Sequence, residues 1–473
     1  MNRFLWWGPL VALFAVAGYV SAGESTDVKE LLERMKKMEA KMAEQEKTIK
    51  DLRAGNETKM SASQQVDKAL ANSSANAIFH DPNLHKRPIK MGGYLDLTYQ
   101  YAINQPTTPV PSYNNDRVFD DMDNNDFNVH LAKIYFDGTA KEKGQAGFRI
   151  DLAFGTDADR IASFGEATRG QLAAMDDDAY LVSGIDNFSI EQAYIDYIIP
   201  VANGIRMKVG KFASPIGFEV IEAQDNWNAT RSFNYGHALP ATHTGIGFEY
   251  QVFSNWYVAG YLVNGWNNMI DNNEGKSGII QSKWSPVKWI TWTVSGMVGN
   301  EVDSSLETEN NGDQSGEDTR YLVNTVITFQ PWEKWEFAAE ATYGLEEGQN
   351  YDDAGGHSGD DAAWWGAAGY LKYKFLPGWY LAARGEYFKD DGATRTVYGN
   401  RFANNLELYS GTLTMSYSPV SPFEIRLEYR YDAASEDWFV AKEYDGGPTL
   451  DDGNSIYRVN TQDTLTIQFL YKF

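Results

Sequence analysis

The sequence has no cysteine among its 473 residues. Disulfide bonds, thiolate metal sites and covalently attached c-type haem are therefore excluded. Long apolar runs are also scarce, because nothing after the first 20 residues reaches the 18 consecutive apolar residues of a transmembrane helix. Basic residues are outnumbered, with 41 Lys and Arg against 65 Asp and Glu, a net charge of −24. An acidic balance of this size argues against a nucleic-acid partner.

The first residues have the layout of a secretory signal peptide. Arg3 precedes an apolar run over 4–20, and the small residues Ser21 to Gly23 follow it. Val20 and Ala22 fall at the −3 and −1 positions, which predicts cleavage after Ala22 and a signal peptide over 1–22. The alternative is an uncleaved membrane anchor.

The next segment, 27–53, has a heptad pattern without Gly or Pro and predicts a short coiled-coil helix. Its a and d positions are Val28, Leu31, Met35, Met38, Met42, Gln45, Ile49 and Leu52. So short a helix is marginal alone, which favours self-association over a lone amphipathic helix on a partner's surface. Residues 54–89, rich in Ala, Asn and Ser, are typical of a linker.

From residue 90 to 473 the pattern is all-β. Sixteen stretches have strand character, and most have the length of tilted membrane strands. The predicted strands are 90–101, 127–139, 145–155, 190–199, 205–212, 242–252, 255–264, 278–285, 288–298, 320–330, 333–343, 363–375, 378–389, 406–418, 423–432 and 462–473. Connections after even-numbered strands are short and those after odd-numbered strands are long, as in antiparallel outer-membrane barrels with periplasmic turns and outer loops.

The best strands alternate apolar and charged residues, as in "FEIRLEYRY" over 423–431. Apolar residues outside and charged residues inside are typical of a water-filled barrel, and sixteen strands leave room for an aqueous channel. The candidate pore-lining residues are Arg149, Asp151, Arg206, Lys208, Arg384, Glu386, Glu424, Arg426, Glu428 and Arg430. Two stretches, 255–264 and 363–375, are apolar on both faces, and their orientation stays open.

The long loops are acidic: 299–319 and 344–362 contain seven and six carboxylates, and neither contains a Lys or Arg. Solvated loops, a vestibule that concentrates cations, and divalent bridging to lipopolysaccharide all fit this composition. "DMDNND" at 121–126 and "DDGN" at 451–454 lack the full register of a calcium loop, so no metal site is predicted. We expect a weak cation preference.

The third long loop, 213–241, is the candidate constriction. It contains Glu219, Glu222, Asp225 and Arg231 together with three aromatic residues that allow it to pack. Folded inward, its acids would face a basic wall of Arg149, Arg206 and Lys208 and create a transverse field. An outer lid packed on neighbouring loops is the alternative.

Residues 205–278 contain "KVGKFASPIGFEVIEAQDNWNATRSFNYGHALPATHTGIGFEY" and "YLVNGWNNMIDNNEGKSG". The region resembles the OmpL-like β-barrel porin family and, more distantly, the phosphate-selective porins, which share the stretch that here contains Gly210, Phe212, Pro215, Gly217 and Glu219. The resemblance implies an outer-membrane channel, often trimeric. Phosphate selectivity does not carry over, because it needs a ladder of basic residues that this acidic chain lacks.

The sequence thus predicts a porin in the outer membrane of a Gram-negative-type bacterium. We expect lipid and lipopolysaccharide around it, small hydrophilic solutes or ions inside it, and no cofactor. A homotrimer with its N-terminal helix in the periplasm is the expected assembly. The alternative is a structural anchor whose coiled coil binds the cell wall or a periplasmic partner. Catalysis is disfavoured, because nothing around the histidines resembles a nucleophile elbow.

Overall fold

The computed structural model describes residues 89–104, 117–120, 124–163, 187–273, 275–301, 319–348, 360–396, 405–441 and 457–473. The chain divides into two units, Met1–Arg87 and Pro88–Phe473. All the described residues belong to the second unit. The predicted signal peptide, coiled coil and nearly all of the linker lie outside them. So do "DDGN" and half of "DMDNND".

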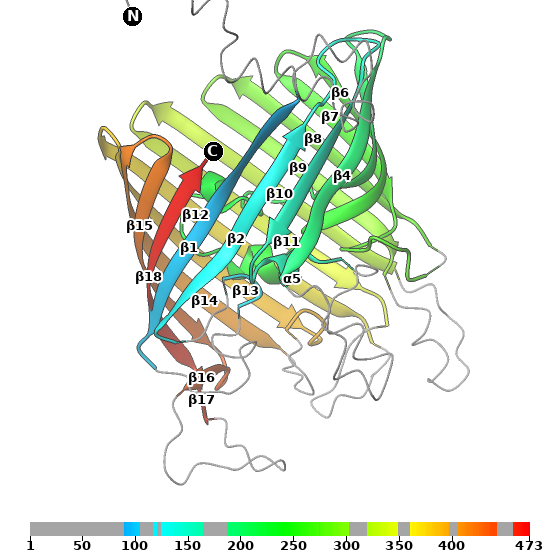
Figure 1. Ribbon diagram of the computed structural model, residues 1–473. Helices are drawn as coiled ribbons and strands as arrows, with labels where there is room; N and C mark the ends of the chain where they lie inside the picture. Colours follow the sequence, from blue (N-terminus) through cyan, green and yellow to red (C-terminus); the bar gives the residue numbers. More distant parts are fainter. Residues whose placement is uncertain are drawn as a thin grey trace, which may run out of the picture. The chain divides into compact units, whose positions relative to one another are not determined.

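The second unit is a closed antiparallel barrel of sixteen strands, which confirms the predicted fold class and strand count. The barrel strands are β1 (Lys90–Ala102), β2 (Asp126–Asp137), β3 (Ala146–Phe154), β4 (Phe188–Ile199), β5 (Ile205–Ala213), β6 (Thr242–Phe253), β7 (Trp256–Val263), β8 (Ser277–Val287), β9 (Ile290–Asn300), β10 (Thr319–Trp332), β11 (Trp335–Glu346), β12 (Ala362–Leu376), β13 (Trp379–Asp391), β14 (Leu406–Val420), β15 (Phe423–Ala434) and β18 (Thr461–Lys472). Neighbours in the chain are neighbours in the sheet (Figure 1).

The barrel closes where its first and last strands pair. β1, blue in Figure 1, runs antiparallel to β18, red, from Tyr94 opposite Lys472 to Ala102 opposite Thr464. Beyond the ladder, the backbones of Gly93 and Phe473 exchange two hydrogen bonds of 3.0 Å. The last residue of the chain is therefore part of the seam, and neither of these two strands is left as an open edge.

Side chains alternate between the two faces of the barrel wall. On β18, Leu465 and Tyr471 are exposed on the outside, whereas Thr466 and Gln468 are buried inside. On β8, the outward Ile280 is 71% exposed. An apolar outer face exposed to this extent is unfavourable in water. It matches the lipid-facing apolar band of an outer-membrane barrel.

The short connections are tighter than the sequence indicates. Pro286 and Pro331, expected in turns, lie in the last residues of β8 and β10, at the places where the ladder register shifts. Proline is tolerated there because an irregular ladder does not need its missing N–H. The connection between β8 and β9 is therefore a two-residue turn, Lys288–Trp289.

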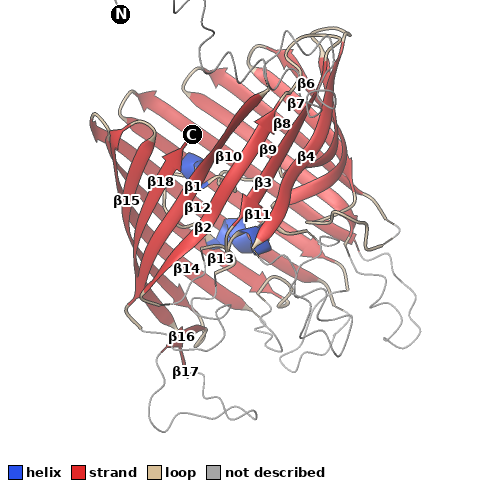
Figure 2. Ribbon diagram, viewed as in Figure 1, coloured by secondary structure: helices blue, strands red, loops and turns tan. Residues whose placement is uncertain are grey.

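The described parts of the connections contain three short helical turns: α5 (Ala158–Ile161), η4 (Ala223–Asp225) and η5 (Asn234–Ala238). Figure 2 shows the helical turns, in blue, surrounded by barrel strands. β16 (Phe439–Ala441) and β17 (Tyr457–Val459) form a small separate sheet. None of the helices among the described residues is long and apolar enough to cross a membrane.

Candidate functional site

The loop over 213–241 lies inside the barrel. Most of its side chains are buried, including Glu219, Arg231 and Phe233, each at most 3% exposed. Its hydrogen-bond partners include inward-facing side chains of β2, β13 and β15. Of the two orientations that the sequence left open, the structure has the inward one.

The wall formed by β13–β15 binds the loop through its charged residues. The Glu428 carboxylate accepts hydrogen bonds from the backbone N–H groups of Ala229 at 2.6 Å and Thr230 at 3.0 Å. The Arg384 guanidinium pairs with Glu219 at 2.8 Å and also donates to the Thr230 carbonyl. Charge-assisted hydrogen bonds of this kind are the stronger ones in proteins.

Two more arginines of the same wall donate to loop carbonyls. Arg426 reaches the carbonyls of Ala223 at 2.9 Å and Asn228 at 3.1 Å, and Arg430 reaches that of Arg231 at 2.6 Å. Glu386 lies between Arg384 and Arg430, 3.5 Å from each. These predicted pore-lining residues do point inward, but the loop covers them.

The wall formed by β2–β4 binds the loop through Lys133 of β2. Its ammonium lies 2.7 Å from Glu222 of the loop, and 2.6 and 2.9 Å from Glu191 and Asp151 of the wall. Burial alone would raise the pKa of Glu222, but the adjacent Lys133 ammonium lowers it. The three carboxylates are close enough together to hold a cation, and the Lys133 ammonium is in contact with all three.

Arg231 anchors the loop to the preceding connections. Its guanidinium lies 2.9 Å from Asp120 and 3.0 Å from Asp157, and all three side chains are buried. Burial by itself would raise the pKa of Asp157, but His130 and Arg231 bring it down to about 2. An ion pair buried this deeply is costly to break from one side, because an unpaired charge stays behind.

The cations of the predicted basic wall pair within the wall. Arg149 pairs with Asp151, Arg206 with Asp196, and Lys208 with Glu249, so these cations are matched by carboxylates of the wall itself. The acids Glu219 and Glu222 pair with Arg384 and Lys133 instead. The charges that face the lumen are therefore arranged as local ion pairs.

The remaining candidates lie nearer the short-turn end. Glu424, at the start of β15, pairs with Arg426 at 2.7 Å and accepts a hydrogen bond from Tyr380. Asp225 of the loop is exposed.

An apolar core fills part of the lumen towards the long-loop end, which the sequence analysis missed. Phe233 and Leu239 of the loop pack there with the inward-facing Tyr261, Trp364 and Phe388. These wall residues belong to, or neighbour, the strands that are apolar on both faces. Strands that are apolar on both faces were thus a signal in the sequence that a loop packs against the inner face of the barrel.

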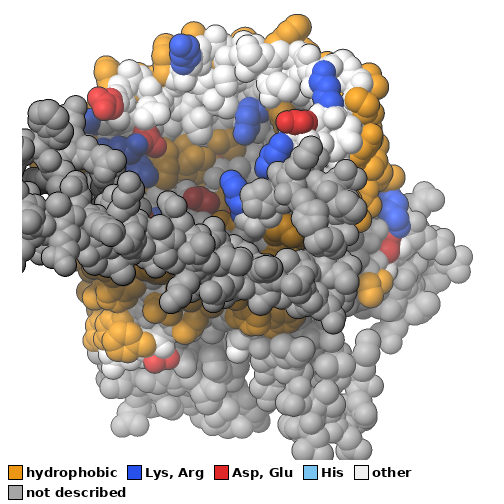
Figure 3. All heavy atoms as spheres, turned by 45° about the horizontal axis from the view of Figure 1, so that its top comes forward, with side chains coloured by type: hydrophobic (Ala, Val, Ile, Leu, Met, Phe, Trp, Pro, Cys, Tyr) orange, Lys and Arg blue, Asp and Glu red, His pale blue; other side chains and the backbone are white. Residues whose placement is uncertain are grey.

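A cavity of about 570 Å³ remains between the loop and the strands β8–β10. It is lined by the loop segment 213–222 and by the inward residues of the three strands, including Lys283 and Thr291 on either side of the β8–β9 turn. The cavity therefore lies towards the short-turn end. Figure 3 looks towards that end and shows basic and acidic side chains around a hollow.

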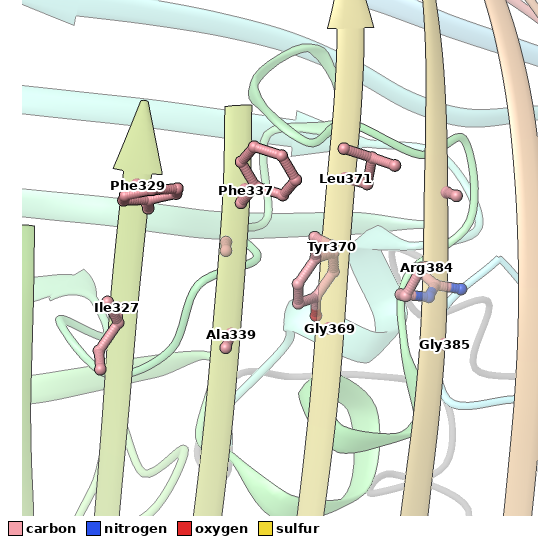
Figure 4. A pocket seen from close by; sticks show the side chains of 11 residues that line it. Ile327, Phe329, Phe337, Ala339, Gly369, Tyr370, Leu371, Arg384 and Gly385 are labelled. Carbon is pink, nitrogen blue, oxygen red and sulfur yellow. The ribbon is translucent and has the colours of Figure 1, made fainter. Parts of the chain in front are cut away.

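Another depression, of about 480 Å³, crosses β10–β13 (Figure 4). Ile327, Phe337 and Leu371 border it, and Gly369 and Gly385 lie between them. A Cβ added at either glycine would meet no atom within 4 Å. Ile327 is among the exposed apolar residues, so this depression is on the outer face of the wall and apart from the lumen.

Three solved structures are similar over most of their length. The outer membrane channel DcaP of Acinetobacter baumannii is 11% identical, with a TM-score of 0.49, covering 81% of this chain and 97% of that chain. The same values hold for OmpF of Salmonella typhi in complex with daunomycin. OmpT of Vibrio cholerae is 10% identical, with a TM-score of 0.47 and the same coverage.

No curated protein sequence matches this chain. A family model does: the one described as "Putative beta-barrel porin-2, OmpL-like" matches residues 88–473, which confirms the resemblance found in the sequence. The chain therefore belongs to this OmpL-like family of outer-membrane β-barrel porins, whose members are channels and not enzymes.

Proposed function

We propose that the protein conducts small hydrophilic solutes or ions across the outer membrane by passive diffusion. The observation that carries this proposal is the cavity beside the loop, inside a closed barrel with charged inner walls. The loop 213–241 is then the constriction, with Glu219, Glu222 and Arg231 holding it in place. Solutes pass between the loop and β8–β10.

The pore-lining residues divide into two groups in this proposal. Arg149, Arg206 and Lys208 lie on β3 and β5, outside the lining of the cavity, and their side chains are 23%, 29% and 17% exposed to water. The buried charges of β13–β15 hold the loop and meet solutes only when it moves.

We further propose a weak cation preference. The net charge of −24 and the carboxylates of the long loops raise the local concentration of cations at the outer mouth. The reversal potential across a bilayer in a salt gradient measures this preference. A clear anion preference would contradict it.

A homotrimer is the proposed assembly, embedded in lipid and lipopolysaccharide, with the helix 27–53 in the periplasm. Deletion of 27–53 is expected to weaken oligomers in a mild detergent. Oligomers that persist unchanged would assign assembly to the barrel wall alone.

The alternative function is a structural anchor whose coiled coil binds a periplasmic partner or the cell wall. The apolar core inside the lumen favours it, because packed side chains narrow the water path. Purified protein in a planar bilayer separates the two functions. Stepwise ohmic currents support the porin, whereas a folded but silent barrel supports the anchor.

A further inference from the structure

The cavity between the loop and β8–β10 has two chemically different sides. Its volume of about 570 Å³ falls within the range of small-molecule pockets, about 300–1,000 Å³. One side is the barrel wall and the other is the loop segment 213–222. The chemistry of each side restricts what can bind.

The wall side is polar. Gln281 and Lys283 of β8, Thr291 and Thr293 of β9, and Thr328 of β10 all line it. Lys283 is exposed, and no carboxylate among the described residues forms an ion pair with it. An ammonium and three hydroxyl groups on neighbouring strands are suitable hydrogen-bond donors for an oxyanion.

The loop side is largely apolar, with Ile216, Phe218 and Val220 lining the cavity. Its two carboxylates are already compensated. Glu219 pairs with Arg384 and accepts two hydrogen bonds from Ser232. Glu222 pairs with Lys133.

Among the described charged groups that line the cavity, Lys283 is thus the one without a compensating ion pair. The local charge that a bound solute meets is positive, although the chain as a whole is acidic. The long loops act on ions approaching the outer mouth, whereas Lys283 acts on a solute inside the barrel.

We propose that this cavity is a binding site for a small carboxylate with an apolar body, such as an aromatic monocarboxylate. The carboxylate contacts Lys283 and the threonine hydroxyls, and the apolar body lies against Ile216, Phe218 and Val220. The inference rests on the proposed porin function, because it names the solute class favoured by the same lumen.

Calorimetric titration of the full-length protein in detergent tests this site without requiring conduction. The probes are benzoate, which has both groups, acetate, which lacks the apolar body, and benzyl alcohol, which lacks the charge. Lys283→Gln is the test variant. Lys288→Gln is the matched control, because it removes the same charge from the adjoining β8–β9 turn, outside the cavity lining.

We expect benzoate to bind the natural protein and Lys288→Gln equally, and Lys283→Gln at least about tenfold more weakly. Acetate and benzyl alcohol should also bind at least about tenfold more weakly than benzoate. Equal benzoate binding by Lys283→Gln, or no benzoate binding by a barrel that conducts, would overturn the site. Benzoate binding by a barrel that does not conduct would instead overturn the porin function and leave the site standing.

Discussion

Individual buried residues hold the loop inside the barrel, and Glu428 accepts four of their hydrogen bonds. Besides the backbone N–H groups of Ala229 and Thr230, its carboxylate accepts hydrogen bonds from the hydroxyl groups of Thr230 and Thr414. One side chain thus joins the loop to two strands of the wall. Removal of its charge should loosen the loop without removing any strand pairing.

Glu428→Gln is therefore expected to lower the free energy of unfolding by about 1.5–3 kcal/mol, since it weakens hydrogen bonds to a charged group. Equilibrium unfolding in urea, followed by tryptophan fluorescence, measures the change. Glu333→Gln, in the exposed β10–β11 turn, is the control and should change little. Equal stabilities of the two variants would contradict the assigned role of Glu428.

His237 of the loop introduces a pH dependence. It is buried beside Phe388, with a ring-centroid distance of 5.5 Å, and its Nδ1 lies 3.2 Å from the Arg395 carbonyl oxygen. Burial lowers its pKa from 6.5 to about 4. Between pH 6.5 and about 4, the unfolded chain therefore binds a proton at His237 that the folded chain does not bind. The free energy of unfolding consequently falls as the pH drops from about 6.5 towards 4.

The loss attributable to His237 amounts to about 3 kcal/mol by pH 4. His237→Gln cannot titrate, and its unfolding free energy should depend less steeply on pH over this window. Unfolding curves of both proteins at several pH values between 4 and 7 provide the comparison. Parallel pH profiles would show that His237 stays accessible to protons in the folded barrel.

Among the strands, the seam between β1 and β18 is closely packed and therefore sensitive to a small change. A Cβ at Gly93 would lie 2.1 Å from the Lys133 carbonyl oxygen and 2.6 Å from the Phe473 ring. On β13, a Cβ at Gly385 would meet nothing within 4 Å. The same substitution therefore tests close packing at the seam against open space elsewhere in the wall.

Gly93→Ala is expected to destabilise the barrel by roughly 1–3 kcal/mol, because the backbone across the ladder must shift. Gly385→Ala should be neutral or slightly stabilising, since alanine loses less conformational entropy than glycine in a strand. Thermal melting in detergent measures both. A Gly93→Ala barrel as stable as Gly385→Ala would mean that the seam is loosely packed.

The strands were predictable from the sequence because the alternation of apolar and polar residues is a local signal. About ten residues are enough to detect it, as in 423–431. The position of the loop was not, because its partners are remote: Thr230 and Glu428 are 198 residues apart. The pairing of Glu219 with Arg384 instead of Arg149 is likewise set by three-dimensional placement. The local signs of packing inside the barrel were the aromatic residues of the loop and the two stretches, 255–264 and 363–375, that are apolar on both faces.

For the molecule as a whole, the closed wall and the folded-in loop have opposite effects on permeation. The sixteen strands of the wall enclose a lumen. The loop is bound to this wall at Lys133, Arg384 and Glu428. It leaves the cavity beside β8–β10 as the space for solutes. Conductance should therefore depend on the loop more than on any single charge.

The most direct test of this account is the single-channel conductance of the natural protein beside a variant in which residues 218–232 are replaced by a Gly-Ser linker of equal length. The account predicts ohmic steps for both proteins and larger steps for the variant, because the linker lacks the side chains that bind the two walls. Replacement of the turn Glu333–Lys334 by Asn-Gly is the control and should leave the steps unchanged. Steps of equal size with and without the native loop, or silence from both folded barrels, would contradict the account.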